Sequence, residues 1–264
     1  MSRLTDEEIL EVQKFIDRAK AQFAERQLVV EVDTDLSNWV NYAERATKDH
    51  KGLQSPITHD PRASNVHPGN SFWVAIREKS RPLWAALMGR ERLVAGCAAH
   101  RVVETDNIIE EIRTQRIYSD KVPRLDFKPV KIVATDNAPV ISGKVGFTGG
   151  FWIHPKYRGA TISGTLSRLV RLLSIRHFDI DWSINFARDT SNRTAMFNQS
   201  YGFPNSISIT KGYYPPYDTD LDMQMNYIHR TEILEQLRSE NAEAEKSGST
   251  SVSDTGERRA PSVH

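Results

Sequence analysis

The sequence predicts an α+β fold in which a mostly antiparallel central sheet is flanked by helices. Short apolar segments separated by turn residues follow one another over residues 72–103, as in a meander of strands. A strand rich in Gly and aromatic residues at 145–153 then leads into a long amphipathic helix at 161–176. The apolar fraction of 39% over 264 residues is sufficient for a sizeable core. We expect a single domain over residues 1–238.

The N-terminal region predicts a helix, a strand and a second helix. Thr5 and Asp6 precede Glu8, which is typical of a helix start. Apolar residues recur at helical spacing after this point, so we expect the first helix at 5–26. The elements expected next are a β-branched strand at 28–32, a helix at 36–47 and a Pro-punctuated loop at 50–70.

The middle of the chain predicts a meander and an extra segment. Strands are expected at 72–76, 83–88 and 93–103, with a turn at 89–92. The extra segment, at about 103–143, contains a helix-like stretch at 107–117. Because it also contains Pro123, Pro129 and Pro139, we expect it to be ordered. Loops carried on a rigid sheet often determine specificity.

The C-terminal half predicts the strongest helix of the chain. The helix at 161–176 has one apolar face, and Arg168 and Arg171 lie off it. A short helix closed by Gly202 is expected near 192–201. Strands are expected at 181–186, 207–209 and 221–227. Residues 239–264 are rich in Glu, Ser, Thr, Gly and Arg and predict a disordered tail.

Composition argues against several classes of function. The formal net charge is +1, so the overall charge gives no reason to expect binding to nucleic acid or to an acidic membrane surface. The single cysteine, Cys97, lies in an apolar run, which indicates a buried, inert thiol and no Cys-rich zinc site. The N-terminus is polar and acidic, and no segment reaches the ~20 apolar residues of a membrane span. We expect a cytoplasmic protein without a metal.

A strand, a turn and a helix form a candidate phosphate site. The turn and the start of the helix contain small residues that let an anion approach the main chain. The first N–H groups of a helix lack internal partners and lie at the positive end of its dipole. Arg158 adds a charge at the entrance. A P-loop is ruled out because Thr165 stands where its lysine would be. An ordinary loop that needs small residues for packing is the alternative.

The same residues resemble the GNAT superfamily of acyl-CoA-dependent N-acyltransferases. The resemblance is clearest over residues 145–228 and depends on three motifs in order. The first is the strand end and turn, Trp152-Ile153-His154-Pro155-Lys156-Tyr157-Arg158-Gly159. The second is Asn192-Arg193-Thr194-Ala195 followed by Tyr201-Gly202-Phe203. The third is the hairpin Lys211-Gly212-Tyr213-Tyr214-Pro215-Pro216 with Asp222-Met223.

The resemblance implies an acyl-CoA co-substrate, acetyl-CoA or another acyl-CoA, and direct transfer to an amine-bearing small molecule or peptide. The sequence departs from the pattern in two ways. Thr161 and Ser163 stand where the family usually has Gly and then Gly or Ala, and the usual tyrosine acid falls on Phe197 or Asn198. The implied catalytic residues are Tyr201, the nearest phenol, and Asn192. The implied cofactor-binding residues are Phe151, Trp152, Ile153, Arg158, Gly159, Ala160, Thr161, Ile162, Ser163, Gly164 and Asn192.

The reaction sets three physical requirements. The thioester carbonyl needs fixed N–H donors, which a splayed strand at 151–153 offers. The amine must be deprotonated, and the departing thiolate benefits from an acid. His154 is interpreted as a capping or solvated residue rather than a base, and Glu104 and Asp106 as a solvated loop. Tyr213 and Tyr214 either line an acceptor pocket or pack in the hairpin. Transfer of a longer acyl chain and a catalytically degenerate CoA-binding module are the alternatives.

Overall fold

The computed structural model describes residues 3–49, 57–80, 87, 92–121, 128, 131–133, 138–158, 161–189 and 200–252. Its helices are α1 (Asp6–Glu25), α2 (Leu36–Asp49), α4 (Ile108–Arg113), α5 (Ile162–Phe178) and α7 (Arg230–Val252), with 3-10 turns η1 (Ile57–His59), η3 (Pro155–Tyr157) and η4 (Pro215–Tyr217). Its strands are β1 (Leu28–Asp33), β2 (Ser71–Glu78), β3 (Val94–Thr105), β4 (Gly143–Ile153), β5 (Trp182–Arg188), β6 (Asn205–Thr210), β7 (Tyr213–Tyr214), β8 (Thr219–Asp220) and β9 (Met223–His229).

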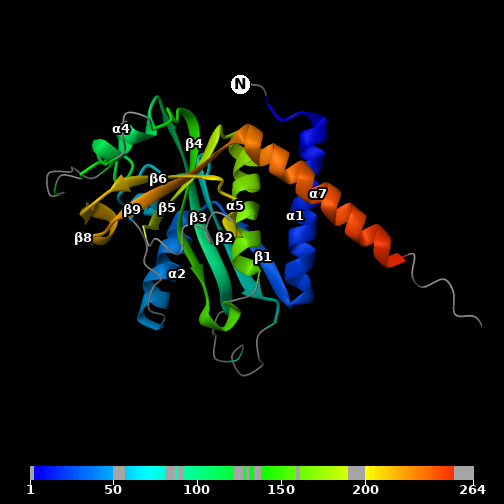
Figure 1. Cartoon of the computed structure of the whole chain (residues 1–264). Helices are drawn as coiled ribbons and strands as arrows, with labels where there is room; N and C mark the ends of the chain where they lie inside the picture. Colours follow the sequence, from blue (N-terminus) through cyan, green and yellow to red (C-terminus); the bar gives the residue numbers. More distant parts are fainter. Residues whose placement is uncertain are drawn as a thin grey trace, which may run out of the picture.

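A seven-stranded sheet has the order β1-β2-β3-β4-β5-β9-β6 (Figure 1). Each neighbouring pair is antiparallel except β4 and β5, which run parallel. The parallel step arises because α5 carries the chain from the end of β4 back to the start of β5. This arrangement confirms the predicted α+β class with a mostly antiparallel sheet. Strands β7 and β8 form a separate hairpin.

Helices cover both faces of the sheet. Figure 1 shows α1, α5 and α7 on one side and α2 and α4 on the other. On the α5 side, apolar residues of α1, α5 and α7 form one core cluster with residues of β2 and β3. Beneath α2, the fully buried Trp39 packs with Trp73 and Trp152 in a second cluster. Burial of such large aromatic side chains contributes strongly to the stability of the sheet.

The extra segment forms a third core cluster on the α4 side. Ile108, Ile112 and Ile117 are fully buried there together with Ile184 of β5 and Met225 of β9. Ile132 also forms an isolated antiparallel bridge with Thr210 of β6. The described part of this segment is therefore packed against the sheet, whereas Pro123 and Pro129 lie outside the described residues.

The first helix begins where the sequence predicted. Thr5 Oγ1 accepts the backbone N–H of Glu8 at 3.2 Å, and the Glu8 carboxylate accepts the backbone N–H of Thr5 at 3.0 Å. This reciprocal capping box satisfies two of the otherwise unpaired donors at the helix start. It confirms the prediction drawn from Thr5, Asp6 and Glu8.

Two expectations are wrong. Residues 239–252 are helical and continue α7, so the predicted disordered tail does not begin at Ser239. Helix α7 packs against α1, and Asn241 is buried and donates to the carbonyl oxygen of Glu11 at 3.1 Å. The polar composition of residues 239–252 did not reveal this helix, because only a narrow stripe of α7 is buried.

Arg171 is also buried, although the helical periodicity placed it off the apolar face of α5. The strand expected at 83–88 lies outside the described residues except for Leu87, and β2 pairs directly with β3.

Candidate functional site

The central feature of the site is a gap that opens between β4 and β5. The two strands pair from Val145 with Trp182 to Thr148 with Asn185. Beyond Thr148, β4 pairs only with β3, and beyond Asn185, β5 pairs only with β9, within the part of the chain that the structure describes. The backbone edge of β4 that faces the gap is thus available to a ligand. Unpaired backbone N–H groups are strong donors that require a partner when water is excluded.

A β-bulge interrupts the pairing of β3 with β4 beside the gap. Ala99 of β3 pairs with Gly149 and Cys97 pairs with Trp152, so β4 has one residue more than β3 between these pairs. Gly150 takes up this extra residue with a φ of +57°, a left-handed conformation that favours glycine. A Cβ at Gly150 would lie 2.1 Å from Cζ2 of Trp39. The bulge therefore depends on glycine for both backbone conformation and packing.

The bulge sets where the next three side chains lie. Phe151 and Ile153 pack against the α5-side core, whereas Trp152 is buried under α2 on the opposite face. Of the predicted cofactor residues on this strand, Trp152 is therefore a core residue, and only its backbone is near the gap. Strand alternation, interrupted by the bulge, accounts for the difference.

The turn after β4 is held to the sheet by polar contacts. His154 accepts the backbone N–H of Lys156 at 3.1 Å, which confirms its interpretation as a capping residue. Glu78 of β2 accepts from Lys156 Nζ at 2.8 Å and from the Tyr157 hydroxyl at 2.6 Å. These contacts lower the pKa of the Glu78 carboxyl despite partial burial. These contacts hold the turn between β4 and α5 against β2.

The start of α5 has the geometry of an anion site. Thr161 is its N-cap residue but makes no side-chain capping hydrogen bond. Arg158 is exposed beside the turn, with its Nε 3.2 Å from the carbonyl oxygen of Ile153. Ile162 is 1% exposed and its side chain belongs to the core, so only its backbone can contribute to such a site. Gly159 and Ala160 lie outside the described residues.

Gly164 has a packing role that the sequence left open. A Cβ there would lie 2.5 Å from the carbonyl oxygen of Ser200. The glycine thus allows the first turn of α5 to approach the Ser200–Tyr201 backbone closely. Packing, the alternative raised for the small residues of the turn, explains Gly164 without any ligand.

Tyr201 lies between the gap and the start of α5. Its ring centroid is 5.3 Å from that of Phe151, in an edge-to-face arrangement, and its hydroxyl is hydrogen-bonded to Ser163. Burial raises the pKa of Tyr201, and the hydrogen bond to Ser163 offsets part of that increase. The phenol is therefore protonated at neutral pH, as a proton donor requires.

Arg171 supports the backbone that carries Tyr201. Its guanidinium donates to the carbonyl oxygens of Tyr201 at 2.8 Å and Gly202 at 3.0 Å, and lies 4.1 Å from the ring centroid of Phe203. Burial lowers the pKa of Arg171 to about 9. A charged side chain retained in this environment holds the segment in place through charge-assisted hydrogen bonds and a cation–π contact.

Several predicted residues lie away from the gap. Glu104 and Asp106 are at the opposite end of the sheet and exposed, since Glu104 pairs with Lys144 near the start of β4. Cys97 is fully buried, and burial raises the pKa of its thiol to about 12, which confirms an inert thiol. Asn192, together with Phe197 and Asn198, lies outside the described residues, so its role stays a prediction.

The sequence analysis missed a row of amides beside the gap. Asn226 of β9 donates to Asn185 of β5 at 2.8 Å, and Gln224 donates to Asn226 at 3.4 Å. Gln224 and Asn226 are buried although both are strongly polar. Gln224 and Asn226 stand at alternate positions of one strand, so their side chains share one face of the sheet, and this spacing could have indicated the row.

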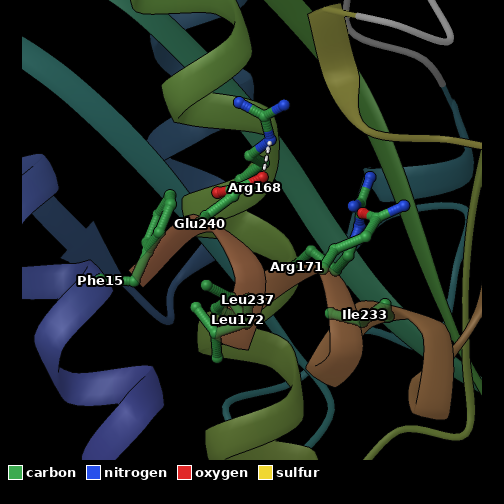
Figure 2. Close-up of a pocket in the computed structure, with 8 residues that line it drawn as sticks. Phe15, Arg168, Arg171, Leu172, Ile233, Leu237 and Glu240 are labelled. Atoms are coloured by element: carbon green, nitrogen blue, oxygen red, sulfur yellow. Dashed lines mark ion pairs between the residues drawn. The ribbon is translucent and has the colours of Figure 1, made fainter. Parts of the chain in front are cut away.

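Two hollows lie away from the gap. The cavity in Figure 2, lined by residues of α1, α5 and α7, has a volume of about 10 Å³, the space of a single water. Figure 2 also shows Arg168 paired with Glu240, 3.2 Å apart. A hollow of about 720 Å³ lies at the end of the sheet away from the gap, and its Arg116 is already paired with Glu111.

Within the ranges that the structure describes, no group of three or more His, Cys, Asp or Glu residues is arranged to hold a metal ion. None of the helices in those ranges has both the length and the hydropathy needed to cross a bilayer.

No protein-family model and no curated protein sequence matches the chain. Among solved structures, it is similar to Arabidopsis thaliana NAA60 in complex with acetyl-CoA at 12% identity and a TM-score of 0.47, covering 77% of this chain and 99% of that one. It is also similar to the ribosomal-protein-S5-alanine acetyltransferase from Vibrio fischeri, at 10% identity and a TM-score of 0.41, with 77% and 93% covered. A chain of the NatC complex bound to Gag peptide and CoA gives 13% identity and a TM-score of 0.41, with 76% and 99% covered.

Proposed function

We propose that this chain is an N-acyltransferase that transfers an acetyl group from acetyl-CoA to an amine. The observation that carries the proposal is the parting of β4 from β5 after Thr148 and Asn185, next to the bulge at Gly150. A thioester placed in this gap meets the free edge of β4. The N–H groups there are fixed before the reaction, so they can stabilise the oxyanion at little reorganisation cost.

The start of α5 supports the same placement of the co-substrate. The uncapped N–H groups that follow Thr161, with Arg158 beside them, form an environment suited to a pyrophosphate. The gap and this helix start are joined by the short η3 turn, so one extended ligand can reach both. The residues present therefore fit the phosphate and thioester ends of an acyl-CoA.

In the proposed reaction, the nitrogen of a neutral amine attacks the thioester carbonyl carbon. A C–N bond forms, the C–S bond breaks, and the departing thiolate takes a proton. Tyr201 is the candidate donor because its phenol is protonated and lies beside Phe151 and Ser163. The amine loses its proton to solvent or to a base that we do not assign.

A ligand panel followed by a turnover assay tests the proposal. Thermal denaturation and calorimetry with acetyl-CoA, a longer acyl-CoA and free CoA should show binding, with the strongest response to acetyl-CoA. Thiol release in the presence of free amines should then follow. A preference for the longer acyl chain would indicate the longer-chain alternative, and binding without thiol release would indicate a degenerate CoA-binding module. An absence of binding to all three ligands would refute the proposal.

A further inference from the structure

The hollow of about 720 Å³ lies beside the part of β3 that extends beyond β2. Strand β2 begins at Ser71, opposite Arg101, whereas β3 continues to Thr105. Over its last four residues, β3 pairs only with β4 within the described part of the chain. The loop before β2, α4 with the residues that follow it, and the end of α5 contribute the other walls. A hollow of this volume has room for a small organic molecule.

A buried guanidinium group lines this hollow. Arg101 of β3 is 3% exposed, and its Nη2 donates to the carbonyl oxygen of Ile117 at 2.6 Å. Its Nε has no hydrogen-bond partner among the described residues. Burial lowers the pKa of Arg101 to about 10, so the group is still charged at neutral pH. A buried charge is costly unless a counter-charge and hydrogen bonds compensate it, so the position of Arg101 requires an explanation.

The neighbouring carboxylates are engaged with other groups. Asp120 and Glu111 attract Arg101 electrostatically, but among the described residues neither forms an ion pair with it. Glu111 Oε1 lies 2.6 Å from Nη2 of Arg116. Asp120 Oδ1 accepts the backbone N–H of Asn65 at 2.6 Å. The described residues therefore supply no counter-ion in direct contact with the Arg101 guanidinium.

The other charges around the hollow favour a ligand with a single negative charge. Lys144 adds a positive charge, and its Nζ lies 3.4 Å from the carbonyl oxygen of Phe178. Glu104 and Asp120 add negative charges and are exposed. These two carboxylates repel a dianion such as phosphate more strongly than a monoanion. A carboxylate carries one charge, and its two oxygens match the planar N–H donors of a guanidinium group.

We propose that this hollow is a second ligand site, which binds a small organic monocarboxylate whose carboxylate pairs with Arg101. The site lies at the end of the sheet away from the gap, so the inference does not depend on the proposed acyl transfer. Val102, Val103 and Phe178 also line the hollow and can contact the carbon chain of the ligand. Because the ligand pairs with a buried charge of the folded protein, its binding should also raise the denaturation midpoint.

An NMR titration of the full chain, labelled with ¹⁵N-arginine, tests the site without any activity assay. The probes are butanoate, hexanoate and benzoate, and hexanamide is the uncharged control. At least one carboxylate should shift the Nε–H signal of Arg101 saturably, with a dissociation constant of about 1 mM or lower. Hexanamide should leave the signal unchanged. The absence of a saturable shift with all of the carboxylates would overturn the inference, as would an equal shift with hexanamide.

The substitution Asp120→Asn tests the electrostatic argument while Arg101 is retained. Asparagine keeps an oxygen that can accept the backbone N–H of Asn65, but it removes a negative charge from the hollow. The carboxylate that binds the wild type should then bind about threefold more tightly. Glu110→Gln is the matched control, because Glu110 pairs with Arg113 and does not line the hollow, and its affinity should equal that of the wild type.

The substitution Arg101→Gln removes the guanidinium charge and should abolish carboxylate binding in a protein that circular dichroism shows to be folded. If this variant does not fold, Asp120→Asn decides the question, since Asp120 is exposed and its replacement leaves Arg101 in place. Unchanged or weaker carboxylate binding in Asp120→Asn would contradict a site at Arg101. Carboxylate binding at wild-type affinity in a folded Arg101→Gln protein would overturn the inference directly.

Discussion

Replacing Gly150 with alanine tests whether the β4 bulge underlies both the stability and the activity of the protein. The alanine has to adopt a φ of +57°, which costs about 1–2 kcal/mol for a residue with a side chain. It also meets the buried Trp39 at 2.1 Å, and overpacking of this kind costs about 1–3 kcal/mol. We therefore expect a loss of roughly 2–5 kcal/mol in the free energy of unfolding.

Gly212→Ala is the matched control for the Gly150 experiment. Gly212 also has a positive φ, +106°, but a Cβ there has no neighbour within 4 Å. This variant should show only the backbone cost, which is about 1–3 kcal/mol because a φ of +106° lies outside the left-handed α region. Urea denaturation with m-values measures both variants. A loss in Gly150→Ala of no more than its own backbone cost of about 1–2 kcal/mol would refute the packing contribution assigned to Trp39.

The same Gly150→Ala variant should lose activity because the backbone at 151–153 shifts relative to the gap. A displacement of about 1 Å in a reacting geometry lowers turnover on the order of 10²-fold. Thiol release from acetyl-CoA under conditions where the variant is still folded measures this effect. Adding Trp39→Phe removes the obstructing atoms, so part of the stability loss should be recovered, and a double-mutant cycle quantifies the coupling. Wild-type turnover in a folded Gly150→Ala protein would show that the bulge does not position the reaction.

Further predictions concern three single residues. Tyr201→Phe should lower kcat by ~10² or more at unchanged acetyl-CoA affinity if the phenol protonates the thiolate, and a loss under tenfold would assign Tyr201 to packing on Phe151. Gly159→Trp should abolish CoA binding in calorimetry while the circular dichroism spectrum is retained, and unchanged affinity would refute the phosphate site at the start of α5. Cys97, with its pKa raised to about 12, should resist maleimide labelling at pH 8 until the protein is unfolded, whereas rapid labelling of the native protein would contradict its burial. Because the folded pKa of Cys97 exceeds its unfolded value of about 9.0, stability should fall as pH rises above 9.0.

The structure also changes how the extra segment should be tested. Shortening residues 103–143 to a tight turn would not test a role of this segment at the site. Ile108, Ile112 and Ile117 of this segment are now seen in a core cluster with Ile184 and Met225. Deletion would expose that cluster and unfold this side of the sheet. Single substitutions that leave this cluster intact therefore test the segment more sharply than a deletion.

Local patterns predicted much of the fold because their physical signals are contained in a few neighbouring residues. Thr5 and Glu8 form the capping box that their spacing predicted, and His154 caps the turn before α5. The alternation of the strands and the apolar stripe of α5 likewise reflect burial on one face. Arg171 is the exception to burial of apolar residues on one face of α5. Helical periodicity shows on which face a residue lies, but it does not show that the carbonyl oxygens of Tyr201 and Gly202 accept hydrogen bonds from Arg171 there.

The sequence by itself determined the order of the elements, the class of the sheet, the buried thiol of Cys97 and the segment in which a cofactor site was to be sought. Each of these depends on residues close together in the chain. The gap between β4 and β5, the bulge against Trp39, the amide row of Asn185 and Asn226, and the meeting of Tyr118 with Tyr214 were decided only by the tertiary structure. The reason is physical: each depends on which residues, separated by about 40 to more than 100 positions, are brought into contact, and strand register and packing determine this once the whole core has formed.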